Sequence, residues 1–461
     1  MRLDKLIRGG MICDAQTAPR RGSIGIAGGR IVAVMSDDVE VDADEVIDAQ
    51  GCVAIPGLLD PHVHLGHGAE HASEFQSEGR SALVGGVTTL LTFYRKHPFN
   101  YLDLVPDLIA AGEANSPVDF LIHLPLYTRQ NLDEISEYRE KLGVRGFKFF
   151  PGIRGDDAAK MTALPHTGPM VGIDDSFVYE GMSRVAGIPD GLALYHAENP
   201  DIIATFAAKV KAEGRRDLLA WCESRPDFGE AQSVQEALWW QRVTGCPLYI
   251  VHVSSAMAMD LIVEAKLRDP KAPIYVETCP QYLTHTKDSK VGTIAKMSPP
   301  LRTVADQEKI WAAIADGHVD TIGSDHGAFM RAEKSDAWES RSGFPGMATI
   351  LPALVTYGVR QGRITLQDLV RICSYQPARI FGIGDRKGSL RPGSDADITI
   401  VDLESSRTVT AQMLQSRSDF SIYEGQTLYG WPRHVLRRGD VLVRDGEVRT
   451  SAQGGGVYLG W

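Results

Sequence analysis

The 461-residue sequence lacks the features of secreted, membrane-bound and nucleic-acid-binding proteins. No segment has about 18 consecutive apolar residues, so no membrane-spanning helix is predicted. The N-terminal residues carry no continuous apolar stretch after a basic region, so no signal peptide is predicted. There is no long run of Lys or Arg, and the net charge of −11 gives no general attraction for a phosphate backbone. We therefore expect a cytoplasmic protein that binds neither membranes nor nucleic acid.

The cysteines are few and widely separated, with no CxxC pair among them. This spacing argues against a disulfide framework and against a structural zinc knuckle. Free cysteine is among the most buried residue types, so reduced packing residues are expected. They are Cys13, Cys52, Cys222, Cys246, Cys279 and Cys373. At 43% hydrophobic and 23% charged residues, the composition excludes global disorder.

Both ends of the chain have a β-rich pattern. Short apolar runs alternate with Gly and Asp turns in residues 23–57, and the same pattern returns in residues 396–449. Because chain ends commonly lie close together at a domain surface, the two segments can complete one sheet. We predict a composite β-sandwich domain formed by residues 1–56 and 386–461.

The middle of the chain, residues 57–385, alternates apolar runs with segments of helical period. Alternation of near-continuous apolar strands with helices is typical of a (β/α)8 TIM-like barrel, an α/β fold. The expected helices cover residues 74–86, 132–143, 201–214, 258–269 and 307–317. The eight apolar runs are residues 53–60, 87–93, 118–124, 144–150, 192–198, 247–253, 272–278 and 319–325.

Histidines and an aspartate follow several of these predicted strands. His62 and His64 are two residues apart on the first strand, so both side chains point to the same face and can reach one metal ion. His196, His252 and Asp325 stand where the fifth, sixth and eighth strands end. A lone histidine after an apolar run is more often a packing residue. Together, however, these residues converge on the mouth of one barrel and predict a metal site there.

Seven motifs occur in an order that resembles the cyclic amidohydrolases, the dihydropyrimidinase/hydantoinase, allantoinase and dihydroorotase branch of the amidohydrolase superfamily. They are DPHVH, GFKFF, HAEN, VHVSS, ETCPQYL, MSPPLR and GSDH. The resemblance covers nearly the whole chain, including both β termini. It implies a hydrolase acting on carbon–nitrogen bonds in a cyclic amide or imide, of the hydantoin or dihydropyrimidine type. It also implies a small-molecule substrate and a homo-oligomer, either a tetramer or a dimer.

The same resemblance implies a binuclear metal centre, with zinc as the expected ion. In this family a lysine is carboxylated by CO2 and its carbamate bridges two divalent metals. A metal-bridging hydroxide attacks the ring carbonyl, and Asp325 would be both a ligand and the general acid/base. The implied ligands are His62, His64 and Asp325 for the first metal, His196 and His252 for the second, and Lys148 for both.

Three further residues are candidate substrate contacts. Ser298 in MSPPLR matches a position where hydantoinase relatives hold the ring through backbone groups, and Ser342 falls where relatives often have an Asn. Arg95 follows the second predicted strand and is placed to bind an anionic or ureido-bearing substrate, although a surface ion pair explains it equally well.

The sequence also departs from the family patterns. Dihydroorotases have an Arg two residues after the paired histidines, where this chain has Gly66, so dihydroorotate is disfavoured. Typical hydantoinases have a Tyr five residues beyond the carboxylated lysine, where this chain has Ile153. Since allantoinases are not expected to depend on this Tyr, an allantoinase is the alternative. Arg154 is a further candidate for a substrate contact. A non-catalytic scaffold is a further alternative, which the presence of all six implied ligands disfavours.

Overall fold

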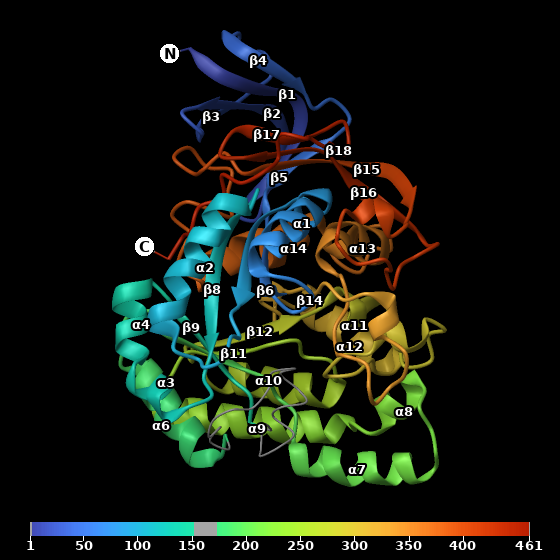
Figure 1. Cartoon of the computed structure of the whole chain (residues 1–461). Coiled ribbons are helices and arrows are strands. Elements are labelled where there is room, and N and C mark those ends of the chain that lie inside the picture. The colour runs from blue at the N-terminus through green and yellow to red at the C-terminus, as the bar shows by residue number, and fades with distance from the viewer. Residues whose placement is uncertain (1, 152–172, 461) are drawn as a thin grey trace.

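The computed structural model describes residues 2–151 and 173–460 and contains two large sheets, one above the other in Figure 1. The upper sheet is built from both ends of the chain, in the order β18-β17-β16-β15-β5-β1-β2-β3, with β4 paired to β1. Its strands are β1 (Leu3–Asp14), β2 (Thr17–Ala27), β3 (Arg30–Met35), β4 (Ala43–Asp48), β5 (Val53–Pro56), β15 (Ile398–Thr408), β16 (Thr427–Arg437), β17 (Asp440–Arg444) and β18 (Glu447–Val448).

Strand β5 joins the two ends of the chain. It pairs in parallel with β1 and antiparallel with β15, which comes from the C-terminal part of the sequence. A separate apolar core, which includes Ile24, Ile398 and Leu436, packs within this sheet. The predicted β-sandwich from both termini is confirmed as a sheet, and the proposed boundaries at residues 56 and 386 stay a prediction.

The lower sheet is the predicted barrel. Its strands are β6 (Leu58–His64), β7 (Val87–Phe93), β8 (Asp119–Pro125), β9 (Gly146–Phe149), β10 (Leu192–Tyr195), β11 (Leu248–Ile250), β12 (Ile274–Thr278), β13 (Thr321–Ile322) and β14 (His326–Gly327). All neighbouring pairs are parallel, and every residue of β7 and β8 is buried, as expected for strands covered on both faces.

The eighth apolar run closes the ring. β13, within this run, pairs with β12, and β14, which directly follows the run, pairs with β6, the first strand of the barrel. Each of the eight predicted runs therefore contributes to the barrel, and the TIM-like fold is confirmed.

Helices surround the barrel (Figure 1), and each of the five predicted helical segments is helical. They are α1 (His71–Val84), α2 (Tyr101–Asn115), α3 (Arg129–Asp133), α4 (Ile135–Leu142), α6 (Asp175–Ala186), α7 (Pro200–Ala212), α8 (Leu218–Glu223), α9 (Asp227–Thr244), α10 (Ala256–Arg268), α11 (Pro280–Thr284), α12 (Val304–Ala315), α13 (Ile350–Leu354), α14 (Leu366–Val370) and α15 (Gln376–Ile380). Within the described ranges, no helix combines the length and the apolar character that a bilayer crossing requires.

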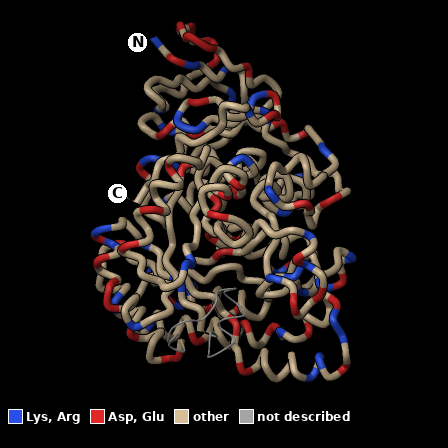
Figure 2. Tube along the Cα trace, viewed as in Figure 1, with Lys and Arg blue, Asp and Glu red and all other residues tan. Residues whose placement is uncertain are grey.

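Charged residues of both signs are interspersed over the two parts of the molecule (Figure 2). One group of charges is buried where the barrel meets the upper sheet: Lys387 contacts Asp119 at the start of β8 and also Asp397, at 2.6 and 2.7 Å. The six cysteines are all free and buried, as predicted.

Candidate metal centre and active site

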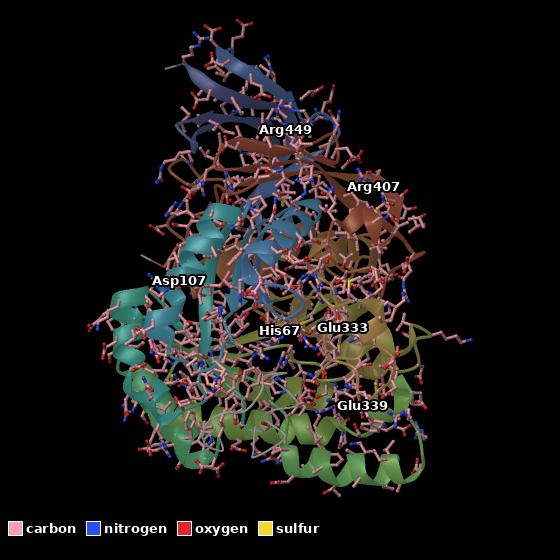
Figure 3. All side chains as sticks on the ribbon, in the orientation of Figure 1. His67, Asp107, Glu333, Glu339, Arg407 and Arg449 are labelled. Atoms are coloured by element: carbon pink, nitrogen blue, oxygen red, sulfur yellow. The ribbon has the colours of Figure 1, made fainter. Side chains whose placement is uncertain are left out.

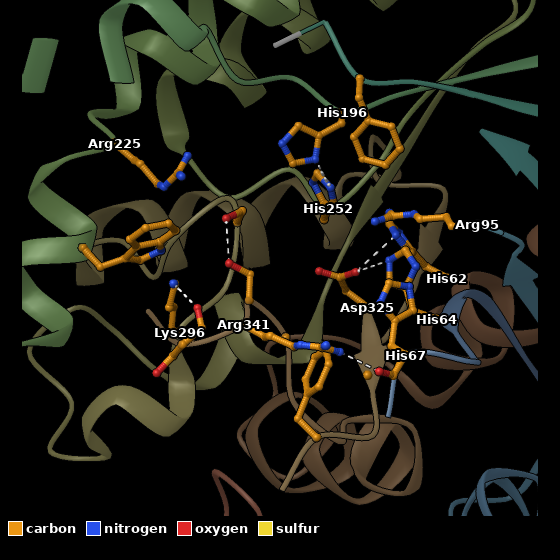
Figure 4. Close-up of a pocket in the computed structure, with 18 of the residues that line it drawn as sticks. His62, His64, His67, Arg95, His196, Arg225, His252, Lys296, Asp325 and Arg341 are labelled. Atoms are coloured by element: carbon orange, nitrogen blue, oxygen red, sulfur yellow. Dashed lines mark hydrogen bonds and ion pairs between the residues drawn. The ribbon is translucent and has the colours of Figure 1, made fainter. Parts of the chain in front are cut away.

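His62, His64 and Asp325 meet at the carboxyl end of the barrel (Figure 4). The Oδ1 atom of Asp325 lies 3.2 Å from Nε2 of His62 and 3.0 Å from Nε2 of His64. One ligand atom from each of the three residues lies within 4.8 Å of the others. Burial lowers the pKa of both imidazoles well below the usual value, so they are neutral at pH 7 and able to bind a cation. The two histidines of the first predicted strand and the aspartate that ends the eighth are therefore brought together.

His196 and His252 form a second group, after β10 and β11. Nδ1 of His196 lies 2.9 Å from Nε2 of His252, and Nδ1 of His252 has no hydrogen-bond partner among the described residues. On its other side, Nε2 of His196 contacts the carboxylate of Glu198 at 2.9 Å. The two groups adjoin, since the rings of His62 and His252 are stacked with centroids 5.3 Å apart.

Lys148 is fully buried on β9, between the aromatic rings of Phe93 and Phe150. Its Nζ lies 4.8 and 5.2 Å from the two ring centroids and has no hydrogen-bond partner within the described part of the chain. Burial lowers the pKa of Lys148 to about 7, although the charges of Glu277 and Asp325 oppose the shift. This amine is not part of a structural ion pair, because no described residue accepts a hydrogen bond from it.

The donors in this cluster fit a pair of metal ions. Buried polar atoms normally have partners, yet Nζ of Lys148 and Nδ1 of His252 have none among residues 2–151 and 173–460. Imidazole and carboxylate are ligands of divalent zinc, cobalt and manganese. An ammonium has no lone pair for a cation, so Lys148 fits the set only after conversion to an anionic oxygen ligand.

The backbone at two of these residues is in an uncommon conformation. His252 and Asp325 have φ angles of 40° and 52°, in the left-handed region that residues other than Gly rarely adopt. Asp60 holds the turn before Asp325, because its carboxylate accepts hydrogen bonds from the N–H and the hydroxyl of Ser324. Backbone strain of this kind is typical of functional sites.

Glu277 is a site residue that the sequence analysis missed. Its Oε1 lies 2.7 Å from Nδ1 of His62 and accepts a hydrogen bond from the backbone N–H of His252, while Oε2 accepts one from Tyr249. A carboxylate on the far nitrogen of a ligand histidine fixes its tautomer and its orientation. Its signal was present in the sequence, since Glu277 is a charged residue near the end of an otherwise apolar strand.

The three predicted substrate contacts line one cavity of about 410 Å³ with the metal-binding candidates. The hydroxyl oxygens of Ser298 and Ser342 lie 3.2 Å apart, and the guanidinium of Arg95 stacks on Phe150 at 4.6 Å. Figure 3 places His67 and Glu339, which also line this cavity, in the barrel part of the molecule, well away from Arg449, which follows the last strand of the upper sheet.

Some of the remaining candidates lie elsewhere. Ile153 and Arg154 fall outside the described residues. His326, which follows Asp325, is buried behind the site, with Nε2 3.0 Å from the carboxylate of Glu78. Burial opposes the charge of Glu78, but the hydrogen bond and charge of His326 hold the pKa of that carboxyl below its usual value.

Comparison with known proteins gives a consistent picture. A profile described as the Amidohydrolase family matches residues 251–442. Among characterised proteins, the chain is 32% identical to an L-hydantoinase of Paenarthrobacter aurescens, with 94% of this chain and 92% of that protein covered. It is also 32% identical to an allantoinase of Deinococcus radiodurans, with 98% of each covered.

The fold is similar to those of solved hydantoinases. An L-hydantoinase (dihydropyrimidinase) from Arthrobacter aurescens superposes with a TM-score of 0.90 at 30% identity, covering 99% of both chains. A D-hydantoinase from a Bacillus species superposes with a TM-score of 0.89 at 31% identity, covering 99% of this chain and 98% of the other.

Proposed function

The chain belongs to the amidohydrolase family, and we propose that it is a metal-dependent hydrolase that opens a cyclic amide or imide ring of the hydantoin or dihydropyrimidine type. The observation that carries this proposal is the meeting of His62, His64 and Asp325 beside a buried Lys148 that has no hydrogen-bond partner in the described ranges. The L-hydantoinase and the allantoinase similar to this chain support the same reaction class.

The proposed centre has two divalent ions, with zinc as the expected metal. The ligands are His62, His64 and Asp325 for one ion, and His196 and His252 for the other. Lys148, carboxylated on Nζ, is the shared ligand. Its burial between two aromatic rings supports the modification, because the carbamate gives this side chain the partners that the ammonium lacks.

Ions bound there would lower the pKa of water and polarise a ring carbonyl. The chain's own residues supply the remaining steps. Asp325, whose pKa is raised by burial, accepts the proton of the attacking water and returns it to the leaving ring nitrogen. Glu277 holds His62 in place. Ser298 and Ser342 position the ring at the centre of the cavity, and Arg95 contacts an anionic or ureido-bearing part of the substrate.

The local structure disfavours dihydroorotate as the substrate. An Arg is expected in dihydroorotases where Gly66 stands, and a Cβ at this position would lie 2.2 Å from the ring of His71, with φ at +81°. No side chain fits there without a rearrangement. Allantoin is the second candidate substrate, supported by the similarity to the Deinococcus allantoinase over 98% of both chains.

We also propose a homo-oligomer, a dimer or a tetramer, in the cytoplasm. Large apolar side chains on the outer helices support the assembly: Tyr179 on α6 and Trp239 and Val243 on α9 are 45%, 58% and 50% exposed. The six free cysteines support a reducing compartment. Light scattering after gel filtration measures the assembly directly.

The test of the proposed function is a metal analysis followed by a substrate panel. We expect about two divalent ions per chain and ring opening of at least one of hydantoin, substituted hydantoins, dihydrouracil and allantoin. Removing the ions with a chelator should abolish turnover, and adding them back with bicarbonate should restore it. A folded protein that binds no metal would instead indicate a non-catalytic scaffold.

A further inference from the structure

Outside the histidine cluster, the cavity is lined by aromatic rings paired with cations: Arg225 and Lys296 lie across the pocket from His62 and His64, and Arg341 lies beside His67 (Figure 4). The guanidinium of Arg225 and the ammonium of Lys296 lie 4.0 and 4.2 Å from the ring centroid of Trp221. The guanidinium of Arg341 lies 5.6 Å from the ring of Phe329. This surface, defined by these five residues and called here the distal wall, has no part in the proposed ring-opening step.

Lys296 is a buried cation without an anionic partner. The residue is 3% exposed, and no carboxylate of the described chain lies within ion-pair distance of its Nζ. The Nζ donates one hydrogen bond, to the backbone carbonyl of Ser340. An ammonium has three donors, and the other two have no hydrogen-bond acceptor among the described residues; Lys296 itself lines the cavity. Burial lowers the pKa of Lys296 to about 8, so it is mostly protonated at neutral pH.

A second buried lysine, close to Lys296 in space but 38 positions further along the chain, has all its donors in hydrogen bonds. Lys334 is 2% exposed and donates to the backbone carbonyls of Lys296, Arg341 and Gly343 at 3.1, 2.7 and 2.7 Å. All its donors are used, and it does not line the cavity. Lys334 therefore holds the backbone at Arg341 and Gly343 in place, whereas Lys296 uses one donor, on the carbonyl of Ser340.

The other cations of the distal wall are partly neutralised. Arg225 contacts the carboxylate of Glu198 at 3.3 Å, and its Nε has no partner among the described atoms. Arg341 donates to the backbone carbonyl of His67 at 2.6 Å, and its Nε lies 3.9 Å from Glu333. Both add positive potential near Lys296 without offering it a counter-ion.

The charge of the whole cavity has the same sign. Apart from Lys148, which the proposed function treats as an anionic ligand, the described lining includes the cations Arg95, Arg225, Lys296 and Arg341, against the carboxylates of Asp325 and Glu339. Glu339 is exposed at the rim. Such a cavity attracts anions, and its low-dielectric walls strengthen the attraction.

We propose that the enzyme selects cyclic amides that carry a carboxylate on a side arm, with the carboxylate bound by Lys296 and the arm lying along Trp221 and Phe329. This inference rests on the proposed function, because the ring must sit at the metal-binding residues for the arm to point to the distal wall. A cavity of about 410 Å³ has room for a substituted ring, since small-molecule sites span roughly 300–1,000 Å³.

The test compares two hydantoins that differ only in charge, one with a carboxyethyl arm and one with a carbamoylethyl arm. For the wild-type holoenzyme we expect kcat/KM to be at least about 30-fold higher for the acid, as for other buried hydrogen-bonded charge pairs. In Lys296→Met this preference should disappear through a higher KM for the acid, while the values for the amide change less than about threefold. Lys296→Arg should keep part of the preference.

Two further variants make the result specific. Lys209→Met removes an exposed lysine of α7 outside this cavity and should leave kcat/KM for both substrates unchanged. Arg95→Met tests the other cation of the cavity. If Arg95→Met loses the preference for the acid and Lys296→Met keeps it, the carboxylate is not bound by Lys296. A wild-type enzyme that prefers the amide, or a Lys296→Met variant that loses both activities equally, would also overturn the assignment.

A binding measurement separates this inference from the proposed function. The ring-opened N-carbamoyl products of the acid and of the amide are titrated into the holoenzyme by calorimetry. Tighter binding of the product with the carboxylate arm, lost in Lys296→Met, supports the distal wall even if no hydantoin in the panel is hydrolysed. Equal binding of the two products contradicts it even if ring opening is observed.

Discussion

Two buried lysines at opposite ends of the barrel differ in whether they have partners for their charge. Lys387, at the base, contacts Asp119, Asp397 and Asp395 at 2.6, 2.7 and 3.2 Å. Lys148, at the mouth, has no hydrogen-bond partner in the described ranges. Burial of a charge is tolerated when it is paired, so Lys387 needs no further partner, whereas the proposed carboxylation and metal binding would give Lys148 its partners.

The pKa shifts of the two lysines have opposite directions. Burial opposes the charge of Lys387, but the carboxylates of Asp397, Asp119 and Asp395 outweigh it and raise its pKa. For Lys148 burial prevails and lowers the pKa to about 7. This difference agrees with the usual division of such barrels, in which the amino-terminal end contributes to stability and the carboxyl end holds the active site.

The largest expected effect is at the mouth. Lys148→Ala should reduce kcat/KM by about 10⁴-fold, because residues that act as one catalytic unit cannot substitute for each other. Short carboxylic acids should restore part of the activity by occupying the vacated space as oxygen ligands. The measurement is steady-state hydrolysis of the best substrate of the panel, with metal content determined in parallel. Unchanged turnover would contradict the proposed role of Lys148.

At the base, a matched change should affect stability instead of chemistry. Lys387→Met leaves buried carboxylates without their main partner and should lower the free energy of unfolding by about 3–5 kcal/mol. Lys148→Met, measured on metal-free protein, should cost far less because no hydrogen bond of the described structure is lost. Urea denaturation gives both values. Equal losses in the two variants would remove the distinction between the ends of the barrel.

Glu277→Gln should weaken metal binding by about 10–100-fold, the usual effect of removing a carboxylate behind a ligand histidine. The amide keeps the shape of the side chain, so the fold should be retained. Competition with a chromophoric chelator measures the affinity, and circular dichroism controls for folding. If affinity is unchanged, the contact with His62 has only a packing role.

The smallest expected effect is a pH dependence of stability at the base. Burial opposes the charge of Asp119, but Lys387 and Arg438 hold its pKa below the usual value. A carboxyl with a lowered folded pKa contributes stability above its unfolded pKa of about 3.9 and loses it as the pH falls through the folded value. The stability difference between wild type and Lys387→Met should therefore shrink on acidification below about pH 4. Urea midpoints measured across this range check the sign, and a constant difference would contradict it.

The sequence was sufficient for the parts of the molecule that depend on local patterns. Apolar runs predicted the barrel strands, and the position of His62, His64, His196, His252 and Asp325 after those runs predicted that they would gather at one end. Each of these inferences uses only residues next to each other in the chain and the rule that parallel strands end on the same side.

The sequence was insufficient where the meaning of a residue depends on a distant partner. His62 and Glu277 are 215 positions apart, and Lys387 and Asp119 are 268 apart. A buried lysine with three carboxylates and one with none look alike in a sequence. The role of Lys148 followed only from the family resemblance, and Lys296 gave no signal before its surroundings were known.

The place of β5 in the upper sheet has a consequence for how the protein is made. One edge of β5 pairs with β1, but the other must wait for β15, which begins at Ile398. While the ribosome synthesises the whole barrel, the nascent chain carries an apolar strand with an open edge, a template for pairing with other chains. We therefore expect chains that stop before β15 to aggregate, and chaperones that shield strand edges to raise the yield of the complete protein.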